Sequence, residues 1–447
     1  MWVVFGEGHI LSAGFSYPDP LEIQPFSGRA LSATVSVPGS KSITNRALVL
    51  AALASQREEC ELTNALQSED TEVMVECLTR LGFRVEVNWP TVRIARNLSG
   101  RIIPAESADL FVANSGTTVR FLTAMLALGH GTYRLDGVPR MRERPIRDLL
   151  NALTQIGAQA TSDNGTGCPP ITLKASGIKA DLVHIRADVS SQFLSALLMA
   201  APHTGRALTI RVDGPVVSEP YIEMTLSMMV SWGSIVSRSE PNEYRVQSVG
   251  ETLLQGRYAI EPDASAASYF FAAAAILGGR VTVQNLSLSS LQGDVHFVGV
   301  LEQMGCRVET CDTGITVHGG ALQGVDVDMN AISDTVMTLG AVACFAEGPT
   351  RIRNVAHIRH KETDRIAALA TELRRLGAAV EEFEDGLKIT PRPLHGAAVD
   401  TYHDHRMAMS LALIGLKVPG VGIKNPGCVA KTYPGFWQDL LKVQSQK

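Results

Sequence analysis

An internal repeat is the feature that most constrains how this chain can fold. Six short apolar segments, each with the character of a helix, open at nearly even intervals along the sequence. The steps between successive openings are 74, 74, 74, 70 and 70 residues, and the openings lie at Ser42, Gly116, Ser190, Ala264, Asp334 and Asp404. A period of this length is typical of a chain built from copies of one supersecondary unit.

A second series of positions shows what each unit contains. A glycine ends an apolar helical pattern 40 to 43 residues after each of the first five openings, and alternating sequence with a turn follows it. Such alternation is typical of a β-hairpin. These glycines are Gly82, Gly157, Gly233, Gly305 and Gly377. We therefore expect an α/β fold made of β-α-β-α-β-β units about 72 residues long.

The sixth unit reaches the end of the chain before a hairpin can follow its second helix. Strand-like sequence remains near the other end, at residues 21–23 and 33–37, and we expect both segments to complete the sixth sheet. This predicts a domain of residues 1–39 plus 261–447 and a central domain of residues 40–260, with three units in each. Residues 1–20 are expected to form a loose extension.

Composition limits the classes of function. The chain has 447 residues, 45% of them hydrophobic, and a net charge of −5, and no run of Lys and Arg is long enough to follow a nucleic-acid backbone. The seven cysteines are scattered and odd in number, which indicates reduced thiols in the cytoplasm. No apolar run reaches about 18 residues. We expect a large soluble enzyme with neither nucleic acid nor membrane as a partner.

The openings of the helices point to an anionic ligand, because the start of a helix has unpaired N–H groups and a partial positive charge. The first opening adds an ammonium, a hydroxyl and a guanidinium within about one turn, at Lys41, Ser42 and Arg46. The alternative is that Ser42 caps the helix and both cations are solvated. The openings at 114–120 and 190–192 offer similar groups to a phosphate or carboxylate.

Two loops also contain candidate chemistry. The segment 140–145 has three arginines in an otherwise acidic protein, and a solvated charge run is the alternative. The segment 361–365 alternates in sign, so that Glu362 is either a general acid/base between cations or one member of surface ion pairs. A metal site at 403–405 is not favoured, because adjacent helix positions face different ways. No Gly-x-Ser-x-Gly motif supports a serine hydrolase.

Taken together, these segments resemble the 5-enolpyruvylshikimate-3-phosphate synthase family, in order from about Leu21 to Trp437. The matching segments are 38–48, 114–117, 140–145, 190–192, 219–221, 361–365, 404–408 and 430–434. The resemblance implies two domains, each of three units around a pseudo-threefold axis, as an inside-out α/β barrel. It also implies that the domains close on two small substrates, shikimate 3-phosphate and phosphoenolpyruvate, and that the enzyme is a monomer.

The resemblance implies site residues by position. The expected ligands of shikimate 3-phosphate are Lys41, Ser42, Arg46, Ser190, Ser191, Gln192, Ser218, Tyr221, Asp334, His357 and Lys361. The expected ligands of phosphoenolpyruvate are Lys41, Gly116, Thr117, Arg140, Gln192, Glu362, Arg365, Arg406 and Lys431. Asp334 is the implied base for the acceptor's 5-hydroxyl, and Glu362, with Lys41, is the implied proton carrier at the methylene carbon. No metal or organic cofactor is implied.

Some positions depart from the commonest pattern of the family. His357 stands where many members have Asn, and Phe121 stands where a proline is common. The family is inhibited by glyphosate at the phosphoenolpyruvate site, and we expect Phe121 to weaken that inhibition by shifting the helix that starts at Gly116.

Two rival functions would also explain parts of this pattern. The related enolpyruvyl transferase that uses UDP-N-acetylglucosamine carries a reactive cysteine in the arginine-bearing loop, and residues 139–147 contain none. A non-catalytic scaffold of six units would have no use for the cations and carboxylates gathered at its helix starts.

Overall fold

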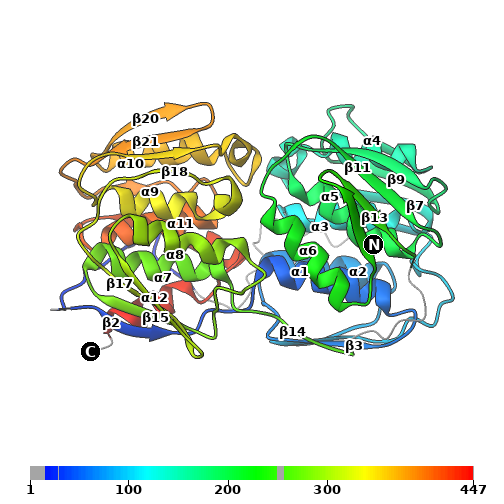
Figure 1. Ribbon diagram of the computed structural model, residues 1–447, viewed down its shortest axis with the longest axis horizontal. Coiled ribbons are helices and arrows are strands. Elements are labelled where there is room, and N and C mark those ends of the chain that lie inside the picture. The colour runs from blue at the N-terminus through cyan, green and yellow to red at the C-terminus, as the bar shows by residue number, and fades with distance from the viewer. Residues whose placement is uncertain (1–15, 29, 249–255, 446–447) are drawn as a thin grey trace.

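The computed structural model of the chain describes residues 16–28, 30–248 and 256–445, and these form two halves side by side (Figure 1). Each half contains three units with the predicted element order, apart from the sixth unit, in which no hairpin follows the second helix. Each of the first five units forms part of a four-stranded sheet, and the sixth sheet has three strands. The predicted repeat therefore describes the architecture.

Three units form the half drawn in blue to green in Figure 1. The first contains α1 (Lys41–Ala54), β3 (Cys60–Thr63), α2 (Glu69–Arg80), β4 (Val85–Asn88) and β5 (Thr91–Ile94). The second contains β6 (Ser107–Phe111), α3 (Gly116–Leu126), β7 (His130–Asp136), α4 (Arg147–Gln155), β8 (Gln159–Ser162) and β9 (Ile171–Ser176). The third contains β10 (Leu182–Ala187), α5 (Ser191–Ala200), β11 (Leu208–Val216), α6 (Pro220–Ser231), β12 (Val236–Glu240) and β13 (Glu243–Val246).

The other half contains the fourth to sixth units. The fourth has α7 (Ala264–Leu277), β15 (Arg280–Gln284), α8 (Phe297–Gln303), β16 (Arg307–Cys311) and β17 (Gly314–His318). The fifth has β18 (Asp326–Asp328), α9 (Val336–Ala343), β19 (Thr350–Arg353), α10 (Arg365–Arg375), β20 (Ala379–Phe383) and β21 (Gly386–Thr390). The sixth has β22 (Ala398–Val399), α11 (His405–Gly415), β23 (Gly422–Ile423) and α12 (Phe436–Ser445).

The five glycines of the second series follow α2, α4, α6, α8 and α10, each two residues after the last residue of the helix. All five have left-handed backbone conformations, with φ between 79° and 104°. Only glycine adopts these angles without steric cost, so each of them ends a helix and turns the chain toward the next strand.

The expectation for the N-terminal strands was half right. β1 (Leu21–Glu22) completes the sixth sheet, because Leu21 pairs with Ile423. β2 (Ser32–Val35) instead joins the fourth sheet and runs parallel to β15. The place is open because β14 (Arg257–Ala259), which precedes α7 in the chain, pairs with β3 in the other half. The first and fourth units have thus exchanged their first strands.

The exchange brings two crossing segments together between the halves. Ser40 donates its backbone N–H to the Glu261 carbonyl at 2.8 Å, and Asp263 donates to the Pro38 carbonyl at 2.8 Å. On one side of this crossing the buried apolar residues form one cluster within residues 43–260. On the other side a second cluster contains the buried apolar residues within 23–37 and 264–443.

The first helices of the units lie at the centres of the halves. α7, α9 and α11 pack on one another, and α3 packs on α1 and α5. Nearly every residue of α7 is buried, which is what an Ala- and Phe-rich helix without a polar face requires. The sheets lie outside these helices (Figure 1). None of the helices in the described ranges is long and apolar enough to span a bilayer.

The described part of the N-terminal segment is not a loose extension. Tyr17 packs edge-on against Trp437, with ring centroids 6.4 Å apart, and its hydroxyl accepts a hydrogen bond from Gln438 at 2.9 Å. The expectation for residues 1–15 concerns positions outside the described ranges.

Candidate active site

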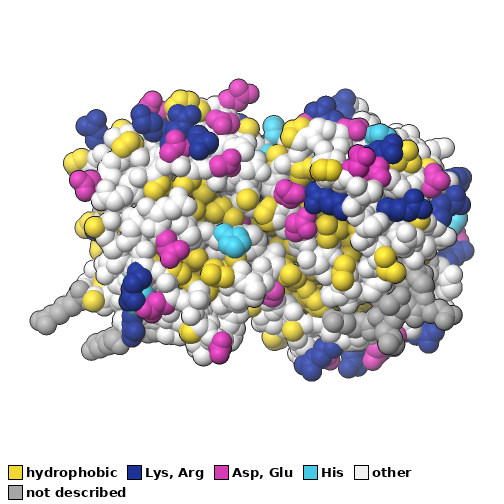
Figure 2. Space-filling model, viewed as in Figure 1, with side chains coloured by type: hydrophobic (Ala, Val, Ile, Leu, Met, Phe, Trp, Pro, Cys, Tyr) yellow, Lys and Arg dark blue, Asp and Glu magenta, His cyan; other side chains and the backbone are white. Residues whose placement is uncertain are grey.

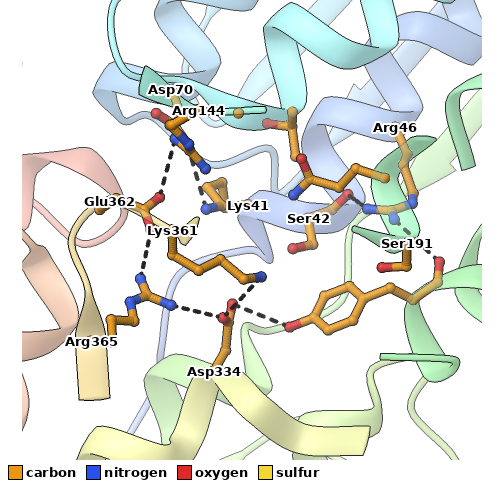
Figure 3. Close-up of a pocket in the computed structure, with 14 residues that line it drawn as sticks. Lys41, Ser42, Arg46, Asp70, Arg144, Ser191, Asp334, Lys361, Glu362 and Arg365 are labelled. Carbon is orange, nitrogen blue, oxygen red and sulfur yellow. Dashed lines mark hydrogen bonds and ion pairs between the residues drawn. The ribbon is translucent and has the colours of Figure 1, made fainter. Parts of the chain in front are cut away.

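A polar pocket lies between the two halves, and several helix starts reach it. It encloses about 520 Å³ of space free of protein atoms. Its lining residues come from α1, from the starts of α3, α5 and α10, from α6, and from Asp70 near the start of α2 (Figure 3). Others come from the loops that precede α4 and α10 and from the 3₁₀ segment that precedes α9. They are Lys41, Ser42, Arg46, Asp70, Gly116, Thr117, Arg144, Ser191, Gln192, Tyr221, Asp334, Lys361, Glu362 and Arg365.

The helix starts are capped by the residues just before them, which leaves other polar groups free for the pocket. The Ser40 hydroxyl accepts the Ile43 N–H at 3.4 Å, so Ser40 and not Ser42 caps α1. Ser115 and Ser190 cap α3 and α5 in the same way. Since Ser42 is the second residue of its helix, the capping alternative for it is wrong, and Ser42 lines the pocket.

Arg365 is the electrostatic centre of the site. Its guanidinium donates to the carboxylates of Asp404 at 2.8 Å, Glu362 at 2.8 Å and Asp334 at 3.0 Å. It is 1% exposed. Burial acts to lower its pKa, but these three carboxylates outweigh burial and raise the pKa further above its ordinary value. The guanidinium is therefore a permanent cation that fixes both implied proton carriers.

Asp334 is held by cations on both oxygens. Oδ1 lies 3.0 Å from Arg365 and 3.8 Å from the Lys361 ammonium, and Oδ2 lies 2.7 Å from Arg406. Burial acts to raise the pKa of Asp334, but Arg406, Lys361 and Arg365 overcome it and hold the pKa well below its usual range. Asp334 is consequently ionised and able to accept a proton.

Glu362 is in a similar position. Burial acts to raise its pKa, and the charges of Arg365, Arg144 and Lys431 lower it well below the ordinary value. Arg144 lies 3.9 Å from its Oε1. The carboxylate is therefore ionised, and it can donate a proton only after gaining one.

Two lysines meet at Asp70, which the sequence analysis missed. Lys431 donates to Asp70 at 2.5 Å and to the Asn114 carbonyl at 3.0 Å, and the Lys41 ammonium lies 3.5 Å from the same carboxylate. Lys431 and Asp70 belong to different halves. The sequence around Asp70 gave only the ordinary signal of acidic residues at a helix start.

The arginine-bearing loop contacts both the other half and the pocket. Arg140, the expected donor-site residue, does not line the pocket; it reaches the other half and donates to the carbonyls of Lys361 and Glu362, both at 3.1 Å. Arg144 lines the pocket instead, is 2% exposed and donates to the Asn114 carbonyl at 2.8 Å. Of the arginines in this motif, Arg144 is the one that lines the pocket, and a role of Arg140 at the donor site stays a prediction.

The missing side chain of Gly116 leaves room for two arginines. A side-chain carbon at this position would lie 2.5 Å from a terminal nitrogen of Arg144 and 2.6 Å from one of Arg120. Arg120 is buried, and it donates to the Gln192 side-chain oxygen at 2.8 Å. It was also missed, although it ends the segment 114–120 that the sequence singled out. Burial, with Arg144 nearby, lowers the pKa of Arg120 to about 9.

Arg46 occupies most of its donors within the protein. It donates to the Thr225 hydroxyl at 2.7 Å, the Ser42 carbonyl at 3.0 Å and the Tyr221 carbonyl at 3.2 Å, and its guanidinium lies over the Phe121 ring at 5.1 Å. Burial lowers its pKa to about 10. Its Nη2 also donates to the Ser195 hydroxyl at 3.5 Å, so within the described part of the chain one N–H, on Nη1, has no partner and is available to a ligand.

The remaining expected residues divide between the pocket and its surroundings. A second, adjoining cavity of about 250 Å³ is lined by Ser190 and His357, together with Arg120, Arg144, Pro145, Val189, Gln192, His360 and Lys361. Ser218 is buried beside it and lies 3.1 Å from His357 Nε2. Arg406 and Lys431 do not line either cavity, but they bind Asp334 and Asp70, which line the main pocket.

His357 is neutral. Burial and the nearby Lys361 charge lower its pKa to about 3. Its ring therefore has one donor and one acceptor nitrogen. Within the described ranges no group of three or more His, Cys, Asp or Glu side chains could hold a metal ion, at residues 403–405 or elsewhere.

Comparison with known proteins gives consistent results. The family model for EPSP synthase (3-phosphoshikimate 1-carboxyvinyltransferase) matches residues 26–440. Relatives named 3-phosphoshikimate 1-carboxyvinyltransferase are 50% identical over 429 residues in Nostoc punctiforme and 49% identical over 423 residues in Trichormus variabilis. The alignments cover 96% and 94% of this chain and 100% and 99% of the relatives.

Solved structures with the same fold are more distant in sequence. The EPSP synthase from Acinetobacter baumannii superposes with a TM-score of 0.76 at 24% identity, covering 94% of this chain and 97% of that one. An enolpyruvyl transferase from Streptomyces tendae superposes with a TM-score of 0.75 at 19% identity, covering 95% and 98%. At these identities the likeness concerns the fold alone.

Proposed function

This chain belongs to the EPSP synthase family and transfers the enolpyruvyl group of phosphoenolpyruvate to shikimate 3-phosphate, and from that premise we propose how its residues divide the work. The observation that supports the proposal most is the meeting of Lys41, Arg144, Lys361 and Arg365 in one pocket with three helix starts. Two substrates with two phosphates and two carboxylates repel each other, and fixed cations offset that repulsion.

The acceptor side of the pocket is assigned to groups near Gln192. Ser190, Ser191, Ser218 and Lys361 would hold the phosphate of shikimate 3-phosphate; the two adjacent serines lie at the start of α5, where backbone N–H groups are also available. Ser42 and Arg46 would hold the carboxylate, with Tyr221 beside them. Asp334 and Lys361 would meet the ring hydroxyls, His357 would lie near them, and Gln192 would lie against the ring.

The donor side is assigned to the cations around Glu362. Lys41, Arg365 and Arg406, with Lys431 behind Asp70, would hold phosphoenolpyruvate near the backbone N–H groups of Gly116 and Thr117. Arg144 replaces Arg140 in this set, because Arg144 lines the pocket and lies near Glu362. Here the negative charge of the substrate competes with carboxylates for the same guanidinium groups.

That competition supports the role of Asp334 as base. While Arg365 and Arg406 pair with Asp334, its carboxylate is a weak base. A bound phosphate or carboxylate draws on the same cations and leaves Asp334 with more of its proton affinity. Asp334 would then remove the proton of the acceptor's 5-hydroxyl as that oxygen attacks the enolpyruvyl double bond.

Glu362 gains from the same effect. The approach of an anion partly neutralises Arg365 and Arg144, so the pKa of Glu362 rises toward a value at which it can carry a proton. We assign it, with Lys41, the transfer of that proton to the methylene carbon. The product of the addition is a tetrahedral intermediate with a methyl group. Phosphate then leaves as this methyl group returns a proton to Glu362, which restores the double bond of the enolpyruvyl group.

Phosphate release tests the assignment of substrates directly. The purified chain should release phosphate from phosphoenolpyruvate with shikimate 3-phosphate as acceptor. UDP-N-acetylglucosamine is the control acceptor and should give no release. Turnover with the control acceptor alone would overturn the substrate assignment.

The crossing segments support a division of the chain into two domains. We propose that residues 1–39 plus 261–447 form one domain and residues 40–260 the other, and that the pairing of Ser40 with Glu261 lies at the hinge.

We also propose that the protein is a monomer and has no nucleic-acid partner. A location in the cytoplasm is in keeping with its seven free cysteines. The face shown in Figure 2 supports the proposal about nucleic acid, because Lys and Arg are interspersed with Asp and Glu on it.

Domain closure gives the first prediction. Arg140 joins the halves through backbone carbonyls and uses no substrate group, so Arg140→Ala should raise KM for both substrates roughly 10-fold while kcat stays within about threefold. Arg142→Ala is the matched control, because Arg142 pairs with Asp136 in its own half.

Small-angle scattering supplies the second readout for closure. We expect a smaller radius of gyration with shikimate 3-phosphate than without it, and a larger ligand-free value for Arg140→Ala than for the unmodified chain. Equal KM values in the Arg140 and Arg142 variants would show that Arg140 is not a closing contact.

Glyphosate sensitivity stays a prediction. Phe121 lies in α3 and is 1% exposed, and the face of its ring packs against the Arg46 guanidinium. We expect glyphosate to compete with phosphoenolpyruvate but to bind more weakly than in family members with proline at this position. A proline inside α3 would remove a helix hydrogen bond, so Phe121→Leu is a sharper test than Phe121→Pro, and it should strengthen inhibition. An unchanged inhibition constant would contradict the packing argument.

A further inference from the structure

The hydroxyl of Tyr221 lies between two carboxylates, only one of which lines the pocket. It is 3.0 Å from Asp294 Oδ2 and 3.3 Å from Asp334 Oδ2. Tyr221 comes from α6 in one half, while Asp294 lies in the 3₁₀ segment η3 (Gly293–His296) and Asp334 in η4 (Asn330–Thr335) of the other. Nothing in the sequence analysis singled out Asp294.

Asp294 is fully enclosed. It is 3% exposed, and its Oδ2 also accepts a hydrogen bond from the Ser265 hydroxyl. Its Oδ1 has no hydrogen-bond partner among the described residues. Because Asp294 does not line either cavity, it reaches the site through Tyr221 and through its charge.

The charged and titratable groups that face Asp294 come from three elements. They are Tyr221 on α6, Asp334 on η4 and Arg406 on α11. Arg365, Lys361 and Lys41 act on Asp334 from further away. Burial, and then the neighbouring Asp334 charge, raise the pKa of Asp294 to about 6. Asp294 and Asp334 thus compete for one hydroxyl and for one guanidinium.

A tyrosine hydroxyl has one proton to donate. We propose that Asp294 is a positioning residue that sets the base strength of Asp334, because it determines which of the two carboxylates accepts the hydrogen bond from the Tyr221 hydroxyl. The inference rests on the proposed role of Asp334 as base. It extends that role to a group that touches neither substrate.

The effect on Asp334 depends on the charge of Asp294. When Asp294 is ionised, it accepts the hydrogen bond from the Tyr221 hydroxyl, and Asp334 receives no hydrogen bond from that hydroxyl. When Asp294 is neutral it accepts more weakly, and Tyr221 turns to Asp334. A donor on Asp334 stabilises its ionised form and makes it a weaker base. Catalysis should therefore weaken as pH falls through about 6 and Asp294 gains a proton.

Asp294→Asn makes the neutral state permanent and keeps the side chain's shape. We expect kcat at saturating substrates to fall roughly 10-fold at pH 7.5. The ratio of unmodified to variant kcat should decline toward 1 at pH 5, because Asp294 in the unmodified chain is then neutral too. Titration of the shikimate 3-phosphate phosphate near pH 6 cancels in this ratio.

A matched control separates this effect from a structural one. Glu372 is buried in the same half, and its Oε1 accepts a hydrogen bond from the Tyr402 hydroxyl at 2.7 Å, remote from the pocket. Glu372→Gln therefore repeats the change of an enclosed, tyrosine-bonded carboxylate to an amide. The ratio of kcat in the unmodified chain to kcat in Glu372→Gln should not depend on pH.

A double-mutant cycle tests whether the effect passes through the hydroxyl. In a Tyr221→Phe background, Asp294→Asn should change kcat less than about twofold at every pH, because no proton is left to reassign. A 10-fold effect that persists in this background would overturn the proposal. The proposal would also be overturned if the ratio of kcat in the unmodified chain to kcat in Asp294→Asn stayed constant from pH 5 to 8. The same holds if the corresponding ratio for Glu372→Gln showed the same pH dependence.

Two further outcomes are distinguishable. If Asp294→Asn does not fold, as judged by circular dichroism, Tyr221→Phe alone should still remove the component of the pH profile near pH 6, and its persistence would contradict the proposal. If Asp334→Asn retains near-normal turnover, the base assignment fails. If Asp334→Asn is inactive and the Asp294 ratio is independent of pH, only the inference about Asp294 fails.

Discussion

Asp334→Asn should lower kcat by on the order of 10² to 10⁴ while the fold stays intact, because it removes the assigned base and keeps the side chain's size. Arg365 and Arg406 now donate to different oxygens of the carboxylate, at 3.0 and 2.7 Å, so the single oxygen of the asparagine can still accept from one of the two arginines. The loss should therefore appear in kcat more than in KM.

Glu362→Gln should have an effect of the same order, for a different reason. An amide cannot carry a proton to the methylene carbon, although it can still meet Arg365. Steady-state assays of both variants, with Glu372→Gln as a control that leaves the pocket unchanged, measure the effects. Turnover near that of the unmodified chain in either variant would remove that residue from the mechanism.

These assignments show which parts of the site can be read from a sequence. The period placed the openings of five of the six first helices within one residue of their observed starts. At Asp334 a 3₁₀ segment comes first, and α9 begins at Val336. The glycine series located the ends of the second helices, because a left-handed residue after a helix has a strong compositional preference.

The exchange of first strands was not predictable from the same pattern. β2 and β14 are both short and alternate in the same way, so neither carries a signal for one sheet over another. Parallel pairing joins residues far apart in the chain, such as Ser32 with Arg280, and local sequence does not encode such a choice. The path of the two crossing segments determines which sheet β2 joins and which sheet β14 joins.

Side-chain direction explains which details of the site could not be predicted from the sequence. Ser40 and Ser42 are both plausible caps, and only the backbone angles at Ser40 decide between them. Arg140 and Arg144 belong to one motif, but the 3₁₀ turn η1 (Pro139–Glu143) turns one toward the other half and the other toward the pocket. Asp70 and Asp294 act across the interface between the halves, where the sequence offers no local signal.

Arg365→Gln should destabilise the fold more than any other single change at the site, by about 3–5 kcal/mol at pH 7. The substitution leaves three carboxylates without the cation that all of them contact within 3.0 Å. It should also abolish measurable turnover, because both proton carriers lose the group that fixes them. Arg353→Gln is the matched control, since Arg353 pairs with Asp326 on the surface, where an ion pair contributes about 0–1 kcal/mol.

The deficit of Arg365→Gln should depend on pH, with a sign that the pKa shifts determine. In the unmodified chain the pKa values of Asp334 and Glu362 are depressed by folding, so their stabilising effect is present at neutral pH and is lost as pH falls through the folded values. Without Arg365 these pKa values rise, and the buried carboxylates oppose folding at neutral pH but not once protonated. Urea denaturation should therefore show the largest difference between variant and unmodified chain near pH 7 and a smaller one near pH 5. A difference that is constant over this range would mean that the carboxylates are not held by Arg365.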